Sequence, residues 1–176
     1  VIFEQFGDMN VRNVLSEIGN VHLEAALSIL DAVDLSDPTN PATSGEEAIG
    51  TAQLEADVLA AGDVKVVARL GFIGAFGNEL DIDSRRSGTS GVVTTVSEEN
   101  TYLIEQSGDM YLASAGVTST DALATAYLTA TVGGIFNGAP GGASNVSSGR
   151  NGLGAQTDIG TALNPLFTEV GMIQSI

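Results

Sequence analysis

The sequence contains no cysteine and no tryptophan, and it has one lysine, Lys65, and one histidine, His22. The lack of cysteine excludes disulfide bonds and thiolate chemistry. No run of 18 apolar residues occurs, so the sequence predicts no membrane-spanning helix. Only nine residues are aromatic, six Phe and three Tyr, which argues against a sugar-hydrolysing cleft lined by rings.

Positive charge is also scarce. Six Lys and Arg stand against 22 Asp and Glu, for a formal net charge of −16. Direct nucleic-acid binding is therefore not expected, because phosphates are neutralised by clustered Lys and Arg. Apolar residues make up 43% of the chain and the mean hydropathy is +0.21, so we expect a folded core under an acidic surface.

Low lysine, excess acid, and abundant Ala, Val, Thr and Gly together are typical of proteins from extreme halophiles. Molar salt shortens the Debye length to about 3 Å, so a large net charge is tolerated there. The same charge keeps the protein soluble. The alternative is an ordinary acidic protein from a low-salt organism, and a comparison of stability in low and molar salt separates the two.

The first 50 residues predict a helical arm and a linker. Apolar residues at three- and four-residue spacing indicate helix over 8–35, with Asp8 or Asn10 as the N-cap. The segment 36–50, "SDPTNPATSGEEAIG", carries two prolines and many turn formers, which predicts a linker.

From Thr51 the apolar period changes to two, which predicts strands. The segment 62–77, "GDVKVVARLGFIGAFG", predicts a long core strand over 64–76, entered at its solvent-exposed end by Lys65. Lys65 is interpreted as an ion-pair partner for a nearby Asp or Glu. Further strands are expected at 51–58, 79–83, 91–97, 101–106, 110–116, 123–136 and 166–176.

Turn signals separate these strands, including a hairpin turn at 106–109, "QSGD". About eight strands with regular turns predict a mainly β domain over 51–176, an antiparallel eight-strand jelly roll or β-sandwich. The segment 137–160 is rich in Gly, Ser and Asn, and we expect a long ordered loop there.

Candidate site residues are few. His22 is interpreted as an ordinary helix histidine, because neither a nucleophile nor further metal ligands accompany it. Glu79, Asp81 and Asp83 share one strand face, with Asp63 in the turn before the preceding strand. Such oxygens could hold Ca²⁺, but no EF-hand pattern is present and a solvated acidic face is the preferred interpretation. The same holds for the last candidates, which are Asp31, Asp34 and Asp37.

Three further motifs are weak. The pair Glu98–Glu99 precedes Asn100 and indicates a turn. The stretch 149–154, "GRNGLG", lacks the preceding strand of a phosphate-binding loop. Asn145 begins an Asn-Val-Ser glycosylation sequon. No residue is therefore assigned to catalysis, to a cofactor or to a metal, and the sequence predicts no enzyme and no cofactor.

The strand pattern of 51–136 and 161–176, the helical arm and the acidic composition together resemble the single jelly-roll major capsid proteins of haloarchaeal icosahedral viruses with an internal membrane. The resemblance implies a structural virion protein that packs upright, side by side, into capsomers. Its partners would be copies of itself and other capsid proteins, near a lipid membrane. Its location would be the virion, assembled in a high-salt host cytoplasm.

Two alternatives stay open. One is another structural β-protein of a halophile, such as a tail, turret or S-layer-like protein. The other is a small ligand-binding β-domain, for example of the cupin type. That fold normally uses several histidines on one metal, and the sequence offers only His22.

Overall fold

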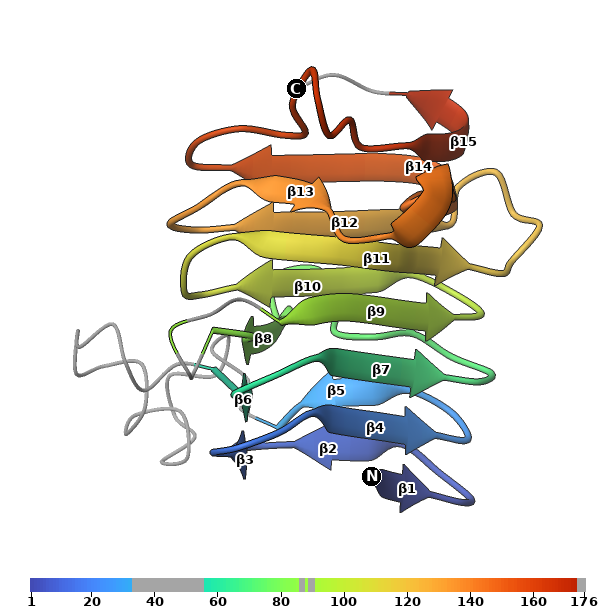
Figure 1. Cartoon of the computed structure of the whole chain (residues 1–176). Coiled ribbons are helices and arrows are strands. Elements are labelled where there is room, and N and C mark those ends of the chain that lie inside the picture. The colour runs from blue at the N-terminus through green and yellow to red at the C-terminus, as the bar shows by residue number, and fades with distance from the viewer. Residues whose placement is uncertain (33–55, 86–87, 89–90, 174–176) are drawn as a thin grey trace.

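In the computed structural model, residues 1–32, 56–85, 88 and 91–173 are described. Within them the chain forms short strands that lie one above another, with the N-terminus at one end of the stack and the C-terminal strands at the other (Figure 1). The strands are β1 (Ile2–Glu4), β2 (Met9–Val11), β3 (Val14–Ser16), β4 (Val21–Ala25), β5 (Ile29–Asp31), β6 (Val58–Ala60), β7 (Val64–Ala68) and β8 (Leu80–Asp83). They continue with β9 (Val92–Ser97), β10 (Thr101–Glu105), β11 (Met110–Val117), β12 (Thr125–Ala130), β13 (Ile135–Asn137), β14 (Val146–Ala155) and β15 (Thr168–Ile173).

Every pairing between these strands is parallel. One row of strands runs β1-β4-β7-β9-β11-β14, and β15 pairs with β14 beyond it. A second row runs β3-β6-β8-β10-β12-β14. Because the chain passes through both rows in turn and each strand pairs with one from the next passage, the fold is a stack of coils, the arrangement of a parallel β-helix.

The core lies inside the coils. In β4 the side chains of Val21, Leu23 and Ala25 are buried while His22 and Glu24 are partly exposed, which is the period-two alternation of a strand with one wet face. The fully buried apolar side chains are Ala, Val, Leu, Ile and Met, without a ring among them. Aromatic side chains instead pair outside the core, as Tyr102 does with Tyr127 at 6.3 Å between ring centroids.

The prediction of a mainly β chain is confirmed, but the antiparallel jelly roll is wrong because the strands pair in parallel. The alternation of apolar and polar residues shows which face of a strand is buried, but it does not show whether the neighbouring strand runs parallel or antiparallel to it. The turn at 106–109 is present, with Gly108 at a φ of 84°. It does not close a hairpin, since β10 pairs with β12 and β11 pairs with β9.

The predicted helical arm is also wrong. Residues 8–31 form β2 to β5, and β4 pairs with β7, so the described residues on both sides of 33–55 belong to one sheet. The only helical turn in the described ranges is a 3₁₀ turn at Pro140–Gly142. None of the described helices is long and apolar enough to cross a membrane. The predicted linker at 36–50 and most of the strand at 51–58 fall outside the described residues.

Two expected segments differ in length. The strand predicted over 64–76 ends at Ala68, and Gly74 turns the chain at a φ of 60°. The expected loop at 137–160 holds the ten-residue strand β14. Its glycines fit because Gly152 lies directly under the ring of Tyr127, where a Cβ would be 2.4 Å from a ring carbon. Gly-rich sequence therefore marks close packing between coils here, and not a flexible loop.

Candidate functional site

No group of three His, Asp or Glu side chains in the described ranges is arranged to hold a metal ion. Three groups of polar side chains stand out instead: an ion-paired row outside the coils, buried carboxyl groups, and corner residues that link successive coils. The exposed apolar side chains are a fourth feature.

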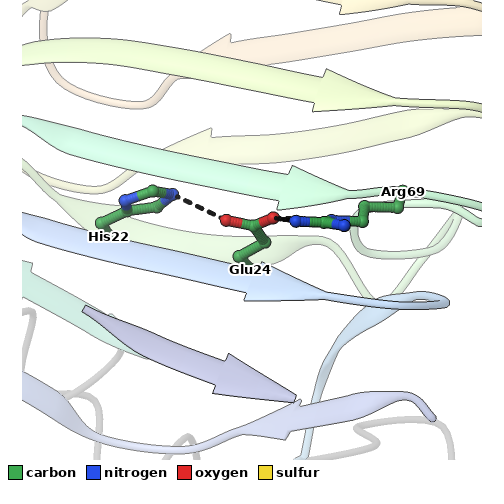
Figure 2. A network of polar contacts seen from close by, with 3 residues as sticks. All are labelled: His22, Glu24 and Arg69. Atoms are coloured by element: carbon green, nitrogen blue, oxygen red, sulfur yellow. Dashed lines mark hydrogen bonds and ion pairs between the residues drawn. The ribbon is translucent and has the colours of Figure 1, made fainter. Parts of the chain in front are cut away.

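The ion-paired row lies on the outer face of β4 and β7 (Figure 2). Glu24 accepts a hydrogen bond from Arg69 Nε at 2.6 Å, and its other oxygen lies 3.5 Å from His22 Nε2. The Arg69 guanidinium lies over the ring of Phe3, 5.4 Å from the centroid. The row joins three successive coils by charge and cation–π contacts. His22 is therefore a strand residue next to a carboxylate, and the prediction of a helix histidine is wrong.

Lys65 lies beside this row. It pairs in register with His22 and Thr94, and with Asn20 and Asp63 these residues line a shallow groove of about 270 Å³. The predicted ion pair of Lys65 is absent from the described part of the chain. Arg69, four residues further on, makes that contact in its place.

Two carboxyl groups are buried among the described residues. Asp57 is 7% exposed, accepts a hydrogen bond from Asp81 N at 3.1 Å and shares a side-chain hydrogen bond with Asp31. Burial, and then the charge of Asp31, raise the pKa of Asp57 to about 9. At neutral pH the Asp57–Asp31 pair therefore holds a proton.

Glu105 is fully buried at the end of β10. Ser84 Oγ donates to it at 2.6 Å, and the backbone N–H groups of Ser84 and Ser107 donate at 3.2 Å. Burial raises the pKa of Glu105 to about 8 although these donors oppose the rise. The carboxyl group satisfies backbone donors between two coils, which is a structural role.

The predicted acidic face of β8 does not converge. Glu79 accepts a hydrogen bond from Gly77 N, Asp83 accepts one from Arg85 N, and Asp81 lies near Asp57. Two of the three carboxylates therefore accept hydrogen bonds from backbone N–H groups two residues away, within local turns. The corresponding prediction for Asp34 and Asp37 lies outside the described residues.

The turns at the corners of the coils share a recurring hydrogen-bond pattern that was not predicted from the sequence. Asn20, Asp63 and Asp109 each follow a glycine and each precede a strand of the first row. The side-chain oxygens accept backbone N–H groups of the next coil: Asn20 from Asp63, Asp63 from Val92 and Asp109 from Gly134, each at 2.9 Å. The recurrence of Gly-Asn or Gly-Asp before an alternating segment was the signal for it.

The other motifs also serve the stack. Glu98 and Glu99 form the exposed turn between β9 and β10, as predicted. The stretch 149–154 lies within β14. Asn145 is fully buried, donates to Leu112 O at 2.7 Å and accepts from Phe167 N at 2.9 Å. Its amide is thus a linker between coils and is not available for glycosylation in the folded chain.

Exposed apolar side chains gather at the two ends of the stack. Among the described residues, those near the N-terminal end are Val1, Ile2, Phe3, Phe6, Leu15 and Ile18, and those near the C-terminal end are Ile159, Leu163 and Phe167. Against these six and three residues, nine at the two ends together, five lie between the ends: Leu27, Leu70, Phe76, Leu123 and Val132. Clustered apolar exposure of this kind marks a surface that another surface covers.

No family model matches the chain, and no curated protein or solved structure was found to be significantly similar to it.

Proposed function

We propose that this chain is a structural protein of a particle or surface in a high-salt environment, built to assemble with copies of itself and not to catalyse a reaction. The observation that carries the proposal is the gathering of exposed apolar side chains at the two ends of the stack. In a chain with a net charge of −16, such patches are costly to expose unless a partner covers them.

The coil architecture supports the same role. Parallel coils linked by corner hydrogen bonds and by the Glu24–Arg69 pair form a stack whose units each contact their neighbours only. Such a stack suits an elongated virion or cell-surface component, of the tail, turret or S-layer-like kind. The composition, with one lysine and 22 acidic residues, supports a halophilic setting.

The capsid form of this role, with upright barrels packed side by side into capsomers near an internal membrane, stays a prediction. It was based on an antiparallel barrel, and the strand pairing gives it no support at the level of the fold. The geometry of assembly distinguishes the capsid form from the elongated forms. Capsomers pack through the sides of a barrel, whereas rods or tubes grow along one axis.

The test is the state of association in molar NaCl. Light scattering after size exclusion and negative-stain electron microscopy should show particles larger than 17.9 kDa, growing with protein concentration. Rods or tubes support the elongated forms, and closed rings or shells support the capsid form. A monodisperse monomer at every concentration in molar salt would contradict the proposal.

A further inference from the structure

The two ends of the stack expose the interior of the coils. In the first row of strands, Ile2 pairs in register with Leu23, and Leu23 with Val66. Leu23 and Val66 are fully buried, whereas Ile2 is 47% exposed. Ile2 therefore points to the inside and is exposed because no described coil lies below it.

The opposite end of the same row is open in the same way. Val146 is fully buried and pairs in register with Thr168, the first residue of β15, which is exposed. A hollow of about 420 Å³ lies at this end, lined by Leu153, Ile159, Pro165, Leu166 and other residues of the 153–168 region. Apolar side chains thus lie at both ends of the buried row, next to polar Thr168 at the C-terminal end.

Strand direction decides which surface can cover these ends. β1 pairs with β4 along one edge and β15 pairs with β14 along one edge, and no described strand lies against the other edge of either. Both belong to rows of parallel strands, so β1 and β15 run in the same direction. A translated copy can therefore place its β1 against β15 and continue the parallel pairing.

We infer that copies of this chain stack head to tail, with β1 of one copy pairing in parallel with β15 of the next and Ile2 lying next to Thr168. The inference rests on the proposed self-assembly and specifies its geometry. In a dimer with a two-fold axis, two copies would meet through the same end, and the opposite end of each copy would stay open. In head-to-tail stacking, the N-terminal end of one copy covers the C-terminal end of the next, so both kinds of end are covered. Because the same contact repeats at each copy, the product is an open filament.

Disulfide trapping tests this register, since the sequence has no cysteine to interfere. Phe3 pairs with Glu24 on the outside of the row, and Glu169 pairs with Ser147 on the same face at the other end. In a head-to-tail stack Phe3 of one copy lies next to Glu169 of the next. Neighbouring strands are about 4.8 Å apart, which is within the Cα separation that a disulfide bridges.

The variants Phe3→Cys and Glu169→Cys, mixed and oxidised in molar NaCl, should form a covalent dimer that neither variant forms alone. The double variant should form a ladder of covalent oligomers. Lys65→Cys mixed with Glu169→Cys is the matched control, because Lys65 is exposed on the same face in the middle of the stack. This control pair should stay monomeric on a non-reducing gel.

A second test uses charge. Ile2→Asp should abolish filaments, while Phe76→Asp, at an exposed position away from both ends, should leave them intact. Circular dichroism shows whether each variant is folded. A disulfide dimer of Phe3→Cys alone would overturn the head-to-tail geometry. A dimer from the Lys65→Cys control would also overturn it, but would leave self-assembly as the proposed function. If every sample were monomeric both on the non-reducing gel and by light scattering in molar NaCl, the head-to-tail geometry and the proposed self-assembly would both be contradicted.

Discussion

Glu105 occupies a position where the coil interior would otherwise be apolar. Leu103, two residues earlier on the same inward face of β10, is fully buried as well. The carboxyl group remains there because it accepts hydrogen bonds from Ser84 and Ser107, donors that an apolar side chain would leave unpaired. Its raised pKa is the consequence of that position.

The pKa of Glu105 makes stability depend on pH. Burial raises this pKa from its ordinary 4.5 to about 8. Between these values the folded chain binds more protons than the unfolded chain, so the free energy of unfolding decreases as pH rises from about 4.5 to 8. The slope approaches about 1.4 kcal/mol per pH unit for one group.

Glu105→Gln should remove this part of the slope and should change stability little at pH 5, where the carboxyl is protonated in the folded state. Chemical denaturation at pH 5, 6, 7 and 8 in constant molar salt measures the difference. Glu105→Ala is the informative contrast, because it leaves the Ser84 donors unpaired and should cost about 2–4 kcal/mol. Parallel stability curves for the wild type and Glu105→Gln would show that Glu105 does not titrate in this range.

Asp57 gives a second pH prediction with a wider range. Its pKa is raised from 3.8 to about 9 by burial and by the charge of Asp31, so the wild type should lose stability as pH rises through this range. Asp57→Asn keeps an oxygen for Asp81 N and adds a permanent donor toward Asp31. We expect this variant to be more stable than the wild type at pH 9 by about 1–3 kcal/mol, measured by denaturation. Equal stability at pH 9 would contradict the shared proton.

The corners between strands are the elements that set the distance between coils. At Gly133, an added Cβ would lie 2.2 Å from Gly108 O and 2.4 Å from the Asp109 carboxylate. At Gly19, an added Cβ would meet only Ser16 Oγ at 3.8 Å, an ordinary contact. The two glycines therefore differ in what a methyl group would displace.

Gly133→Ala should destabilise the chain by about 2–4 kcal/mol because the next coil must move away from the corner. Gly19→Ala, as the matched control, should change stability by less than about 1 kcal/mol. Both are measured by thermal and chemical unfolding. Equal effects of the two substitutions would mean that the corner is not closely packed.

Elements were predicted better than their partners. The turns at 98–100 and 106–109 and the strands starting near residues 64, 91, 101 and 110 follow local rules, and each is confirmed within a few residues. Pairing direction does not follow from those rules, since an alternating strand accepts a parallel or an antiparallel neighbour. The prediction of an eight-strand barrel depended on long-range strand pairing, which the local sequence pattern does not determine.

The error in 8–35 has a local cause. Apolar residues at Val11, Val14, Leu15 and Ile18 happen to fit helical spacing because two short strands and two corners follow each other closely there. The alternation of Val21, Leu23 and Ala25 was the competing signal. The buried roles of Glu105, Asp57 and Asn145 could not be predicted, because each depends on a partner 21 to 33 residues away in the sequence.

At the scale of the whole molecule, the charge of −16 repels itself across the surface. Molar salt screens this repulsion. The melting temperature should therefore rise by about 5–10 °C between 0.1 M and 3 M NaCl, which corresponds to a gain of a few kcal/mol in the free energy of unfolding. Differential scanning calorimetry measures it. A melting temperature independent of salt would contradict the halophilic interpretation.

High salt also strengthens apolar burial in any protein, so a charge variant is needed as a control. Glu98 and Glu99 lie exposed in the turn between β9 and β10. Replacing both by Gln makes the net charge less negative by two without touching the core. This variant should gain less stability from salt than the wild type; an identical gain would assign the effect to apolar burial.

The register between coils has a consequence for how such a chain can change over generations. Leu23 pairs with Val66, 43 residues further on, whereas Thr95 pairs with Ala115, 20 residues further on. The stacked rows keep their register although the lengths of chain between them differ about two-fold. Added sequence between β5 and β6 is thus tolerated by the rows on either side, and this junction is a place where an engineer could graft a foreign epitope or a whole domain.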